Sequence, residues 1–371
     1  MTDDFWVEQA DQSRVKTEIV VDYLKAWWQI MKKRAPQVGY VDLFSGPGRF
    51  DDGTESTPLL VLRTALEDKE LSSRLKTFFN DINERYVRRL RQTISEIDGI
   101  GRLRYPPIVK NSRVSAETER EIERTCGQIP ILSFLDPWGY VGLSAKLIAK
   151  LVRGFGSDAI FFFNYTAINR AITLDSVGPH LAQLLGPARL AKLRQDLPAP
   201  PDERERRIVK ALMDSLQERD SRLLTLTFRV WTPRKTTSHY ICFTTKNPTA
   251  YKVMKDIMAR RGWVDEDGVP RLEYVPPSSG RPLGLFESPR PLRELPSALL
   301  DRFAGRSVRF RQLVDEHHVG TPFVEANYRT VLLTMEQQGQ IECDPPADRR
   351  RRRQGRPTLS DNVVIRFPNR P

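Results

Sequence analysis

An apolar stretch that ends in two glycines constrains this chain more than any other feature. Val38–Phe44 has the composition of a buried parallel strand, and Gly46 and Gly48 follow it directly. Thr57-Pro58 then opens an apolar segment, which predicts a helix with Thr57 as N-cap and Pro58 as its first residue. This order predicts a nucleotide cradle, because glycine lets a ligand approach the backbone.

The spacing of the glycine motif indicates which class of nucleotide cofactor it could bind. The dinucleotide fingerprint requires a third glycine where this chain has Asp51, and Asp81 lies beyond the roughly 20-residue spacing of its ribose-binding acid. An Asp-x-Phe-x-Gly-x-Gly turn with a late acid resembles the S-adenosylmethionine (SAM) site of class I methyltransferases. A tight turn without a ligand stays open as an alternative, as does a turn cap for Asn111. The predicted SAM contacts are Asp42, Phe44, Gly46, Gly48 and Asp81, with Asn111 for the adenine amine.

Strands and helices alternate through the first half of the chain. This pattern predicts an α/β fold with a Rossmann-like, doubly wound, mostly parallel sheet covered on both faces. Ligands in such sheets bind outside the carboxyl ends of the strands, so Gly46, Asp81, Asn111, Asp136 and Asn164 are expected on one rim. The predicted strands are Val38–Phe44, Lys76–Asp81, Pro107–Lys110, Ile131–Asp136 and Ala159–Asn164, and the predicted helices are Pro58–Lys69, Glu84–Glu96, Ala116–Arg124 and Ser144–Val152.

The remaining patterns suggest the domain limits. Ser13–Arg34 is amphipathic, and its Trp27 and Trp28 are expected in the core rather than stacked on a base. Leu223–Trp231 and His239–Thr244 predict a terminal antiparallel hairpin, with a covering helix after it. We expect an N-terminal helix in 1–37, a methyltransferase-like domain in 38–264 with a helical insertion at 168–219, a Pro-, Gly- and Ser-rich linker in 265–291, and a basic domain in 292–371.

The basic domain has the pattern of a winged helix. Val308–His317 and Pro322–Gln338 predict two helices, and Ile341–Cys343 and Val363–Phe367 predict two strands around an arginine-rich loop. From Arg290 onward the chain has 15 Arg and no Lys against 10 Asp plus Glu. The predicted phosphate contacts are Arg349, Arg350, Arg351, Arg352, Arg353 and Arg356, and a protein partner for this loop stays open as the alternative.

The overall composition sets outer limits. A net charge of +12 favours a polyanionic partner, nucleic acid above all. No apolar run approaches the ~20 residues of a membrane span, and the acidic N-terminus is not a secretory signal, so a cytoplasmic protein that does not bind membranes is expected. The three cysteines and four histidines show no ligand spacing, which argues against a disulfide framework or a structural metal.

A second motif ends the fourth predicted strand. In Asp136-Pro137-Trp138-Gly139-Tyr140 a carboxylate, a rigid proline and two aromatic residues follow one another. The carboxylate and a nearby backbone carbonyl suit the two N–H groups of an amine, and the Trp138 or Tyr140 ring suits stacking on a base. The motif resembles the Asp/Asn-Pro-Pro-Tyr/Phe motif of amino-methyltransferases, and the Asp-Pro-Phe-Gly form of some tRNA guanine-N2 methyltransferases more closely. We therefore predict Asp136, Pro137 and Trp138 at the target; an Asp-Pro turn that caps the next helix is the alternative.

Several motifs between Lys16 and Met258 together match one known family. They are Lys16 and Tyr23, Val41 to Gly48, Ser56 to Leu59, Phe79 to Asn83, Leu135 to Tyr140, Phe163 to Tyr165 with Asn169-Arg170, and Cys242 to Met254. On these residues the chain resembles the three-Cys-motif partner protein (TcmP) family. This resemblance implies a class I methyltransferase-like fold, often with a C-terminal winged-helix-like part, and a partner that carries the three cysteines and is related to radical-SAM enzymes. Arg113 stands where the family pattern has an acid near the adenine.

Two functions from different classes follow. The first is a SAM-dependent methyltransferase that acts on an exocyclic or ring amine of DNA or RNA, together with a three-Cys-motif partner. The second is a catalytically silent adaptor that binds SAM, nucleic acid or that partner. The two intact strand-end motifs favour the enzyme, because an adaptor needs no carboxylate to position an acceptor.

Overall fold

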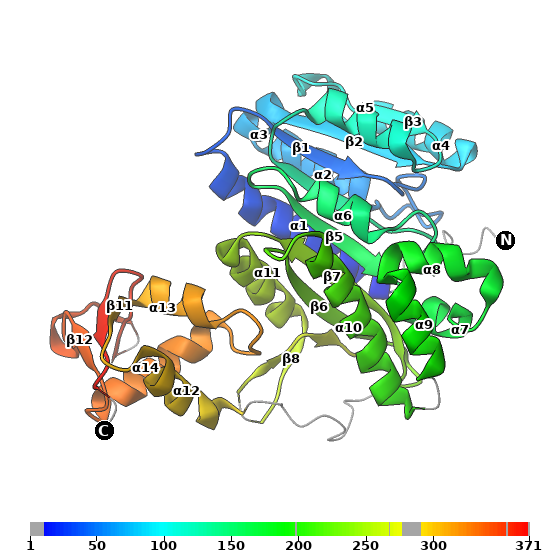
Figure 1. The fold of residues 1–371 in the computed structure, drawn as a ribbon. Coiled ribbons are helices and arrows are strands. Elements are labelled where there is room, and N and C mark those ends of the chain that lie inside the picture. The colour runs from blue at the N-terminus through cyan, green and yellow to red at the C-terminus, as the bar shows by residue number, and fades with distance from the viewer. Residues whose placement is uncertain (1–10, 197–198, 267, 277–290, 354, 370–371) are drawn as a thin grey trace. The chain divides into compact units, whose positions relative to one another are not determined.

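The computed structural model describes residues 11–196, 199–266, 268–276, 291–353 and 355–369 (Figure 1). The chain divides into two compact units. The first is Met1–Tyr251 with Tyr274–Gly280, and the second is Lys252–Glu273 with Arg281–Pro371. The boundary therefore falls inside helix α11 (Pro248–Arg261).

The first unit is built on one mixed sheet. Strands β1 to β5 run parallel to one another, whereas β7 is antiparallel to both β5 and β6. This arrangement confirms the predicted fold class, a doubly wound sheet that ends in an antiparallel hairpin. In the order β10-β6-β7-β5-β4-β1-β2-β3 the sheet contains β1 (Val38–Asp42), β2 (Leu75–Asp81), β3 (Ile108–Asn111), β4 (Ile131–Leu135), β5 (Asp158–Phe163), β6 (Leu224–Trp231), β7 (Thr237–Thr245) and β10 (Glu273–Tyr274).

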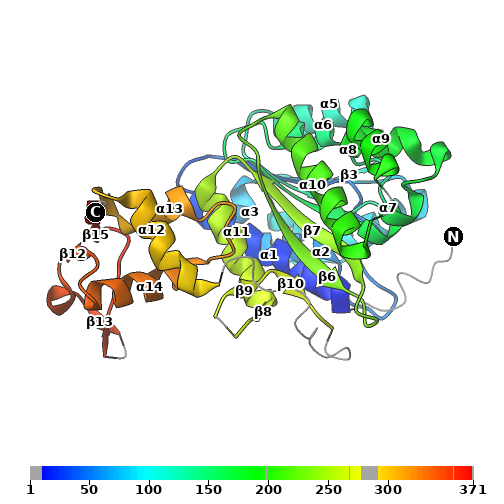
Figure 2. The ribbon, with the colours of Figure 1, turned by 60° about the horizontal axis from the view of Figure 1, so that its bottom comes forward.

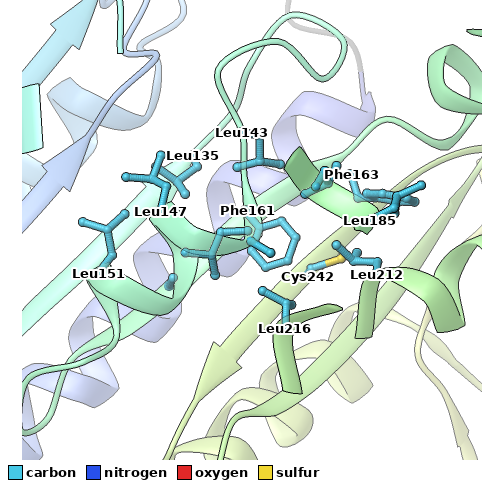
Figure 3. Close-up of a cluster of buried hydrophobic side chains, with 14 of the residues drawn as sticks. Leu135, Leu143, Leu147, Leu151, Phe161, Phe163, Leu185, Leu212, Leu216 and Cys242 are labelled. Carbon is cyan, nitrogen blue, oxygen red and sulfur yellow. The ribbon is translucent and has the colours of Figure 1, made fainter. Parts of the chain in front are cut away.

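Apolar side chains bury one face of this sheet under helices from the second half of the unit. Figure 3 shows Phe161 and Cys242 of the sheet meeting leucines of the helices that cover it. The insertion expected at 168–219 supplies most of this cover, since its helices bury leucines such as Leu184 and Leu212. The covering helices are α5 (Ala116–Cys126), α6 (Ala145–Leu151), α7 (Tyr165–Ala171), α8 (Gly178–Leu185), α9 (Pro187–Gln195) and α10 (Pro201–Arg219).

Helix α1 (Asp11–Met31) covers the opposite face (Figures 1 and 2). Trp27 Nε1 donates to the Gly156 carbonyl at 2.8 Å, and the Tyr23 hydroxyl donates to Asp158 at 2.7 Å. Lys16 lies over the Phe162 ring, 4.8 Å from its centroid. Because these contacts advance along β5 as the helix numbering falls, α1 runs antiparallel to β5. Trp27 and the neighbouring Trp28 are 2% and 1% exposed, which confirms that both belong to the core.

The helices that follow β1 and β2 start and end close to the predicted positions, with one correction at a cap. Ser56, and not Thr57, is the N-cap of α2 (Thr57–Glu67), and Pro58 is its second residue. Ser56 is held in an extended conformation because its N–H donates to the Gly48 carbonyl at 2.8 Å. The other helices here are α3 (Lys69–Arg74), which sequence reasoning missed, and α4 (Glu84–Ser95).

The second unit has the elements of a winged helix. In its three-stranded sheet β15 lies between β11 and β12, and the Phe303 and Phe367 rings stack with centroids 5.5 Å apart in its core. The described elements are β8 (Trp263–Val264), β9 (Pro270–Arg271), α12 (Leu295–Phe303), β11 (Ser307–Arg309), α13 (Phe310–His317), α14 (Glu325–Gln337), β12 (Glu342–Asp344), β13 (Arg352–Arg353), β14 (Arg356–Pro357) and β15 (Val364–Arg366).

Three sequence expectations change in this unit. The predicted helix Val308–His317 begins only at Phe310, because Val308 pairs with Ile365 as part of β11. Helix α12 was not predicted, although its leucines recur every four residues. Within the linker expected at 265–291 the chain forms β9 and β10, and residues 277–290 lie outside the described residues.

One buried lysine holds the turn between α13 and α14. The Lys255 ammonium donates to the carbonyl oxygens of His318, Thr321 and Phe323 at 2.6, 3.0 and 3.0 Å. Burial lowers the pKa of Lys255 to about 7, and the three carbonyls stabilise its charged form. This single side chain therefore fixes the loop that leads into α14.

No helix in the described ranges combines the length and the apolarity needed to cross a membrane.

The buried Asp158 makes the stability of the first unit depend on pH. Burial raises its pKa to about 6, against 3.8 for an exposed aspartate. The folded state therefore binds this proton more tightly, so the stability that the group contributes is full below pH ~4 and is lost as pH rises through about 6. We expect wild type to lose about 2 kcal/mol relative to Asp158→Asn between pH 4 and pH 7, at ~1.4 kcal/mol per pKa unit.

Urea unfolding of both proteins at a series of pH values would measure this difference. Replacement of the exposed Asp98 by Asn is the matched control and should show no such trend. A stability difference between wild type and Asp158→Asn that is constant with pH would contradict the assignment.

Candidate functional site

The glycine turn after β1 is tied to the end of β2. Gly46 and Gly48 have φ values of 62° and 83°, a region that side chains disfavour. A Cβ at Gly48 would lie 2.7 Å from a methyl carbon of Leu90, so packing as well as conformation requires glycine there. The Gly46 N–H donates to Asp81 at 3.0 Å, and the Ser45 N–H donates to the Asn80 carbonyl at 2.9 Å. The turn is therefore held by bonds within the chain.

Asp81 and Asn111 both bond to backbone groups near this turn. The second Asp81 oxygen accepts from the Asn83 N–H at 2.8 Å, and burial raises the pKa of Asp81. The Asn111 amide donates to the carbonyls of Asp81 and Ile82 at 2.9 and 3.0 Å, which is the turn-stabilising role considered for it. These bonds orient the Asn111 side-chain oxygen, an acceptor of the kind that an adenine amine requires.

Asp42 is a buried carboxylate at the end of β1. One of its oxygens accepts from the Phe44 N–H at 3.1 Å. Burial raises its pKa well above that of an exposed aspartate, and the nearby negative charges of Asp136 and Asp81 raise it further. The Lys16 ammonium acts in the opposite direction. A cationic ligand would therefore be favoured at this carboxylate.

Asp136 is paired with a lysine that sequence reasoning did not assign to the site. The Lys16 ammonium donates to one Asp136 oxygen, and the two side chains are 9% and 21% exposed. The signal was present in the sequence, because Lys16 lies on the apolar face of its helix, four and seven residues before the buried Val20 and Tyr23. A charged residue on such a face usually has a buried partner.

His239 completes this side of the site. Its ring stacks on Phe162 with centroids 3.9 Å apart, and its Nδ1 lies 2.9 Å from the Ser238 hydroxyl. Burial lowers the pKa of His239 well below its usual value, and the Lys16 charge lowers it further. The imidazole is therefore neutral at pH 7 and does not compete with Lys16 for the Asp136 carboxylate.

A cavity of about 240 Å³ brings most of the predicted site residues together. Beside it, a second space of about 30 Å³ is lined by Asp42 and shares Ser13, Lys16, Phe44 and Asp136 with the first. Gly48 and Asn111 line neither. The larger cavity is lined by Ser13, Lys16, Phe44, Gly46, Asp81, Asp136, Pro137, Trp138, Gly139, Phe162, Asn164, Ser238 and His239.

The aromatic residues after Asp136 are placed differently from one another. The Trp138 side chain is 61% exposed and lines the cavity, whereas Tyr140 packs against the hydrophobic core. Pro137, directly before Trp138, is buried. Of these two aromatic rings, Trp138 therefore contributes to the cavity and Tyr140 to the core.

A space of about 410 Å³ lies elsewhere, near the starts of β4 and β5, where Ile131 and Ser157 line it together with Lys150. It contains none of the predicted site residues. In the part of the chain that the structure describes, no group of three or more His, Cys, Asp or Glu side chains is arranged to hold a metal ion.

The arginine-rich segment of the second unit separates into two kinds of residue. Arg350 is buried and its guanidinium pairs with Glu336, so it belongs to the packing of the unit. Arg349, Arg351, Arg352, Arg353 and Arg356 are exposed. In the β13–β14 hairpin Arg353 lies directly opposite Arg356, an arrangement in which like charges repel.

Comparison with known proteins identifies the C-terminal part. Residues 276–348 match a domain family described as the GMT-like wHTH domain, which agrees with the winged-helix elements of the second unit. No curated relative matches the chain.

Solved structures with similar folds align loosely. Protein LPL1258 of Legionella pneumophila has a TM-score of 0.40 and 9% identity, covering 64% of this chain and 87% of that one. The methyltransferase domain of bacterial CtHen1 has a TM-score of 0.33 and 12% identity, with coverages of 62% and 99%. A predicted O-methyltransferase of Agrobacterium tumefaciens, Atu636, has a TM-score of 0.30 and 9% identity, with coverages of 62% and 79%. Similarities this low indicate nothing about substrate.

Proposed function

We propose that this protein is a SAM-dependent methyltransferase that acts on an amine of a nucleic acid. One observation carries the proposal: residues of the two strand-end motifs, Gly46 and Asp136, line one cavity at the carboxyl edge of a doubly wound sheet. This edge is where such sheets bind ligands. The basic winged-helix unit adds a surface suited to a polyanion.

The residues at this edge fit the parts of SAM. The glycine turn gives the nucleoside close access to the backbone, and the Asn111 side-chain oxygen suits the adenine amine. Asp42 suits the cationic amino group, because a positive ligand would offset the cost of its buried charge. Asp81 holds the turn and lines the cavity, where its carboxylate suits a ribose hydroxyl.

The target amine is proposed to bind at Asp136. When SAM is bound, it supplies an electrophilic methyl group. The Asp136 carboxylate accepts one amine N–H and so orients the nitrogen lone pair, while Trp138 stacks on the base. The protein contributes mainly the relative position of the two reactants, because the acceptor residues line the same cavity as Gly46 of the glycine turn.

We further propose that the protein works in the cytoplasm with a three-Cys-motif partner. The support is the resemblance of Lys16 to Met258 to the partner-protein family. A catalytically silent adaptor is the alternative, and the experiments below separate the two.

The proposed SAM site predicts that removing the charge of Asp42 weakens the binding of SAM. Wild type should bind SAM or S-adenosylhomocysteine, and Asp42→Asn should weaken binding by about tenfold or more, since a hydrogen bond to a charged group contributes ~1.5–3 kcal/mol. Titration calorimetry would measure both. Asp51→Asn, in the same loop but with a half-exposed carboxylate, is the matched control and should bind normally. A wild type that binds neither compound would remove the SAM proposal.

The proposed target site predicts that replacing Asp136 slows methyl transfer but leaves the affinity for SAM unchanged. Asp136→Asn keeps the side-chain shape but replaces part of the acceptor by a donor, so methyl transfer should slow by roughly 10²-fold through lost positioning. SAM affinity should change little. Transfer of labelled methyl into mixed DNA and RNA pools, with and without the three-Cys partner, would measure the rate.

A melting curve is needed beside that assay, because Asp136→Asn also leaves Lys16 without its carboxylate. Transfer by the folded variant at the wild-type rate would reject the role of Asp136. If wild type transfers no methyl to any nucleic acid, even with the partner present, the adaptor is the correct function.

The exposed arginines predict a steep dependence of nucleic-acid binding on salt. Opposed Arg353 and Arg356 repel each other in the free protein, and a phosphate between them would relieve that cost. Replacement of Arg352, Arg353 and Arg356 by Gln should reduce the slope of log affinity against log salt by about 2 to 3. The matched control replaces the exposed Arg260, Arg293 and Arg302. Equal slopes in the two triple variants would indicate that the hairpin serves a protein partner.

A further inference from the structure

Lys16 and Asp136 place a hydrogen-bond donor directly beside an acceptor. The Lys16 side chain is 9% exposed. The bond from its ammonium to Asp136 uses one of the three N–H groups. The Asp136 carboxylate has further lone pairs, because its two oxygens together offer about four acceptor sites. Both side chains line the 240 Å³ cavity that also contains Gly46.

The position of Lys16 is set from several sides. Its ammonium lies over the Phe162 ring, and the helix that carries it is fastened further along by the Tyr23–Asp158 bond. The neutral ring of His239 lies against Phe162, the same ring that the Lys16 ammonium contacts. The donor is therefore pre-positioned before any acceptor arrives.

Only some nucleobases present the complementary pattern. Adenine has its amine beside the unprotonated N1, and cytosine has its amine beside the unprotonated N3, so each offers a donor next to an acceptor. On its base-pairing edge guanine has the N1–H donor beside its amine, and this hydrogen would face the Lys16 ammonium. The other neighbour of the guanine amine, the acceptor N3, lies on the edge next to the sugar and not on the base-pairing edge. Uracil and thymine have no amine to accept a methyl group.

We infer that the acceptor is the exocyclic amine of adenine or cytosine, selected because Lys16 donates to the adjacent ring nitrogen while Asp136 accepts from the amine. This inference rests on the proposed methyltransferase function and narrows its substrate. In the transfer step the amine nitrogen forms a bond to the methyl carbon, the carbon–sulfur bond breaks, and sulfur keeps the electron pair. The surplus amine proton passes to Asp136 and then to solvent. Lys16 only orients the base.

Atomic substitution in the acceptor tests this inference. Single-stranded oligonucleotides that carry one adenine or one 1-deazaadenine differ only in the ring nitrogen, and cytosine with 3-deazacytosine forms the equivalent pair. Wild type should show a roughly 10- to 100-fold lower kcat/KM for the deaza base of the preferred pair. Lys16→Met should be slower on the natural base but should no longer distinguish the two members of the pair. Lys25→Met, an exposed lysine of the same helix, should keep the wild-type ratio.

The outcomes separate this inference from the function on which it rests. Absence of transfer to every oligonucleotide would overturn the proposed function and this inference with it. Transfer to guanine, or equal wild-type rates on natural and deaza bases, would overturn the inference and leave the methyltransferase intact. A Lys16→Met protein that remains folded and still discriminates would assign the selection to another residue.

Discussion

The alignment of α1 along β5 is the constraint on which the site depends. Three side chains of α1 fix it: Trp27 contacts the Gly156 carbonyl, Tyr23 contacts Asp158, and Lys16 contacts Asp136 and Phe162. The first two lie at the start of β5, so they act at a distance from the cavity and still determine where Lys16 reaches the carboxyl edge. The Lys16–Asp136 contact is the one that joins α1 to the carboxyl edge itself.

The carboxyl edge of the sheet concentrates negative charge. Asp42, Asp81 and Asp136 come from three different strands, and burial raises the pKa of the first two. Lys16 offsets part of this charge by pairing with Asp136 and by its field at Asp42. An edge of this kind is better suited to a cationic cofactor than to a phosphate-rich one, since each phosphate would add charge of the same sign. The same balance explains why the dinucleotide interpretation fits poorly here.

Some positively charged side chains of the second unit hold its fold together, and others are exposed on its surface. Arg350 and Lys255 hold the second unit together through Glu336 and through three carbonyl groups. The exposed arginines of β13 and β14 have no such role, and two of them face each other across the hairpin. The formal net charge of +12 therefore overstates the positive charge that is exposed to a polyanion. The surface arrangement, and not the total, determines where nucleic acid would bind.

The sequence by itself determined the fold class, the alternation of strands and helices along the chain, and the strand ends that bear the candidate site residues. These follow from local rules: apolar runs of strand length, glycines that require positive φ, and the meeting of parallel strands at one edge. Gly46 and Asp136 accordingly line one cavity. Local patterns predict secondary structure less well where tertiary contacts determine it. Val308, for example, is predicted in a helix but pairs with Ile365 in a strand.

Only the tertiary structure decided which side chains meet across long separations. Lys16 and Asp136 are 120 residues apart, and their contact depends on the direction in which α1 crosses the sheet. Five adjacent arginines have identical side chains, yet only Arg350 finds a buried carboxylate, because the chain turns inward there toward α14. The spacing of residues along the chain carries no information about such directions. They arise from the packing of whole helices and sheets, in which each contact is favourable only when the others are already formed.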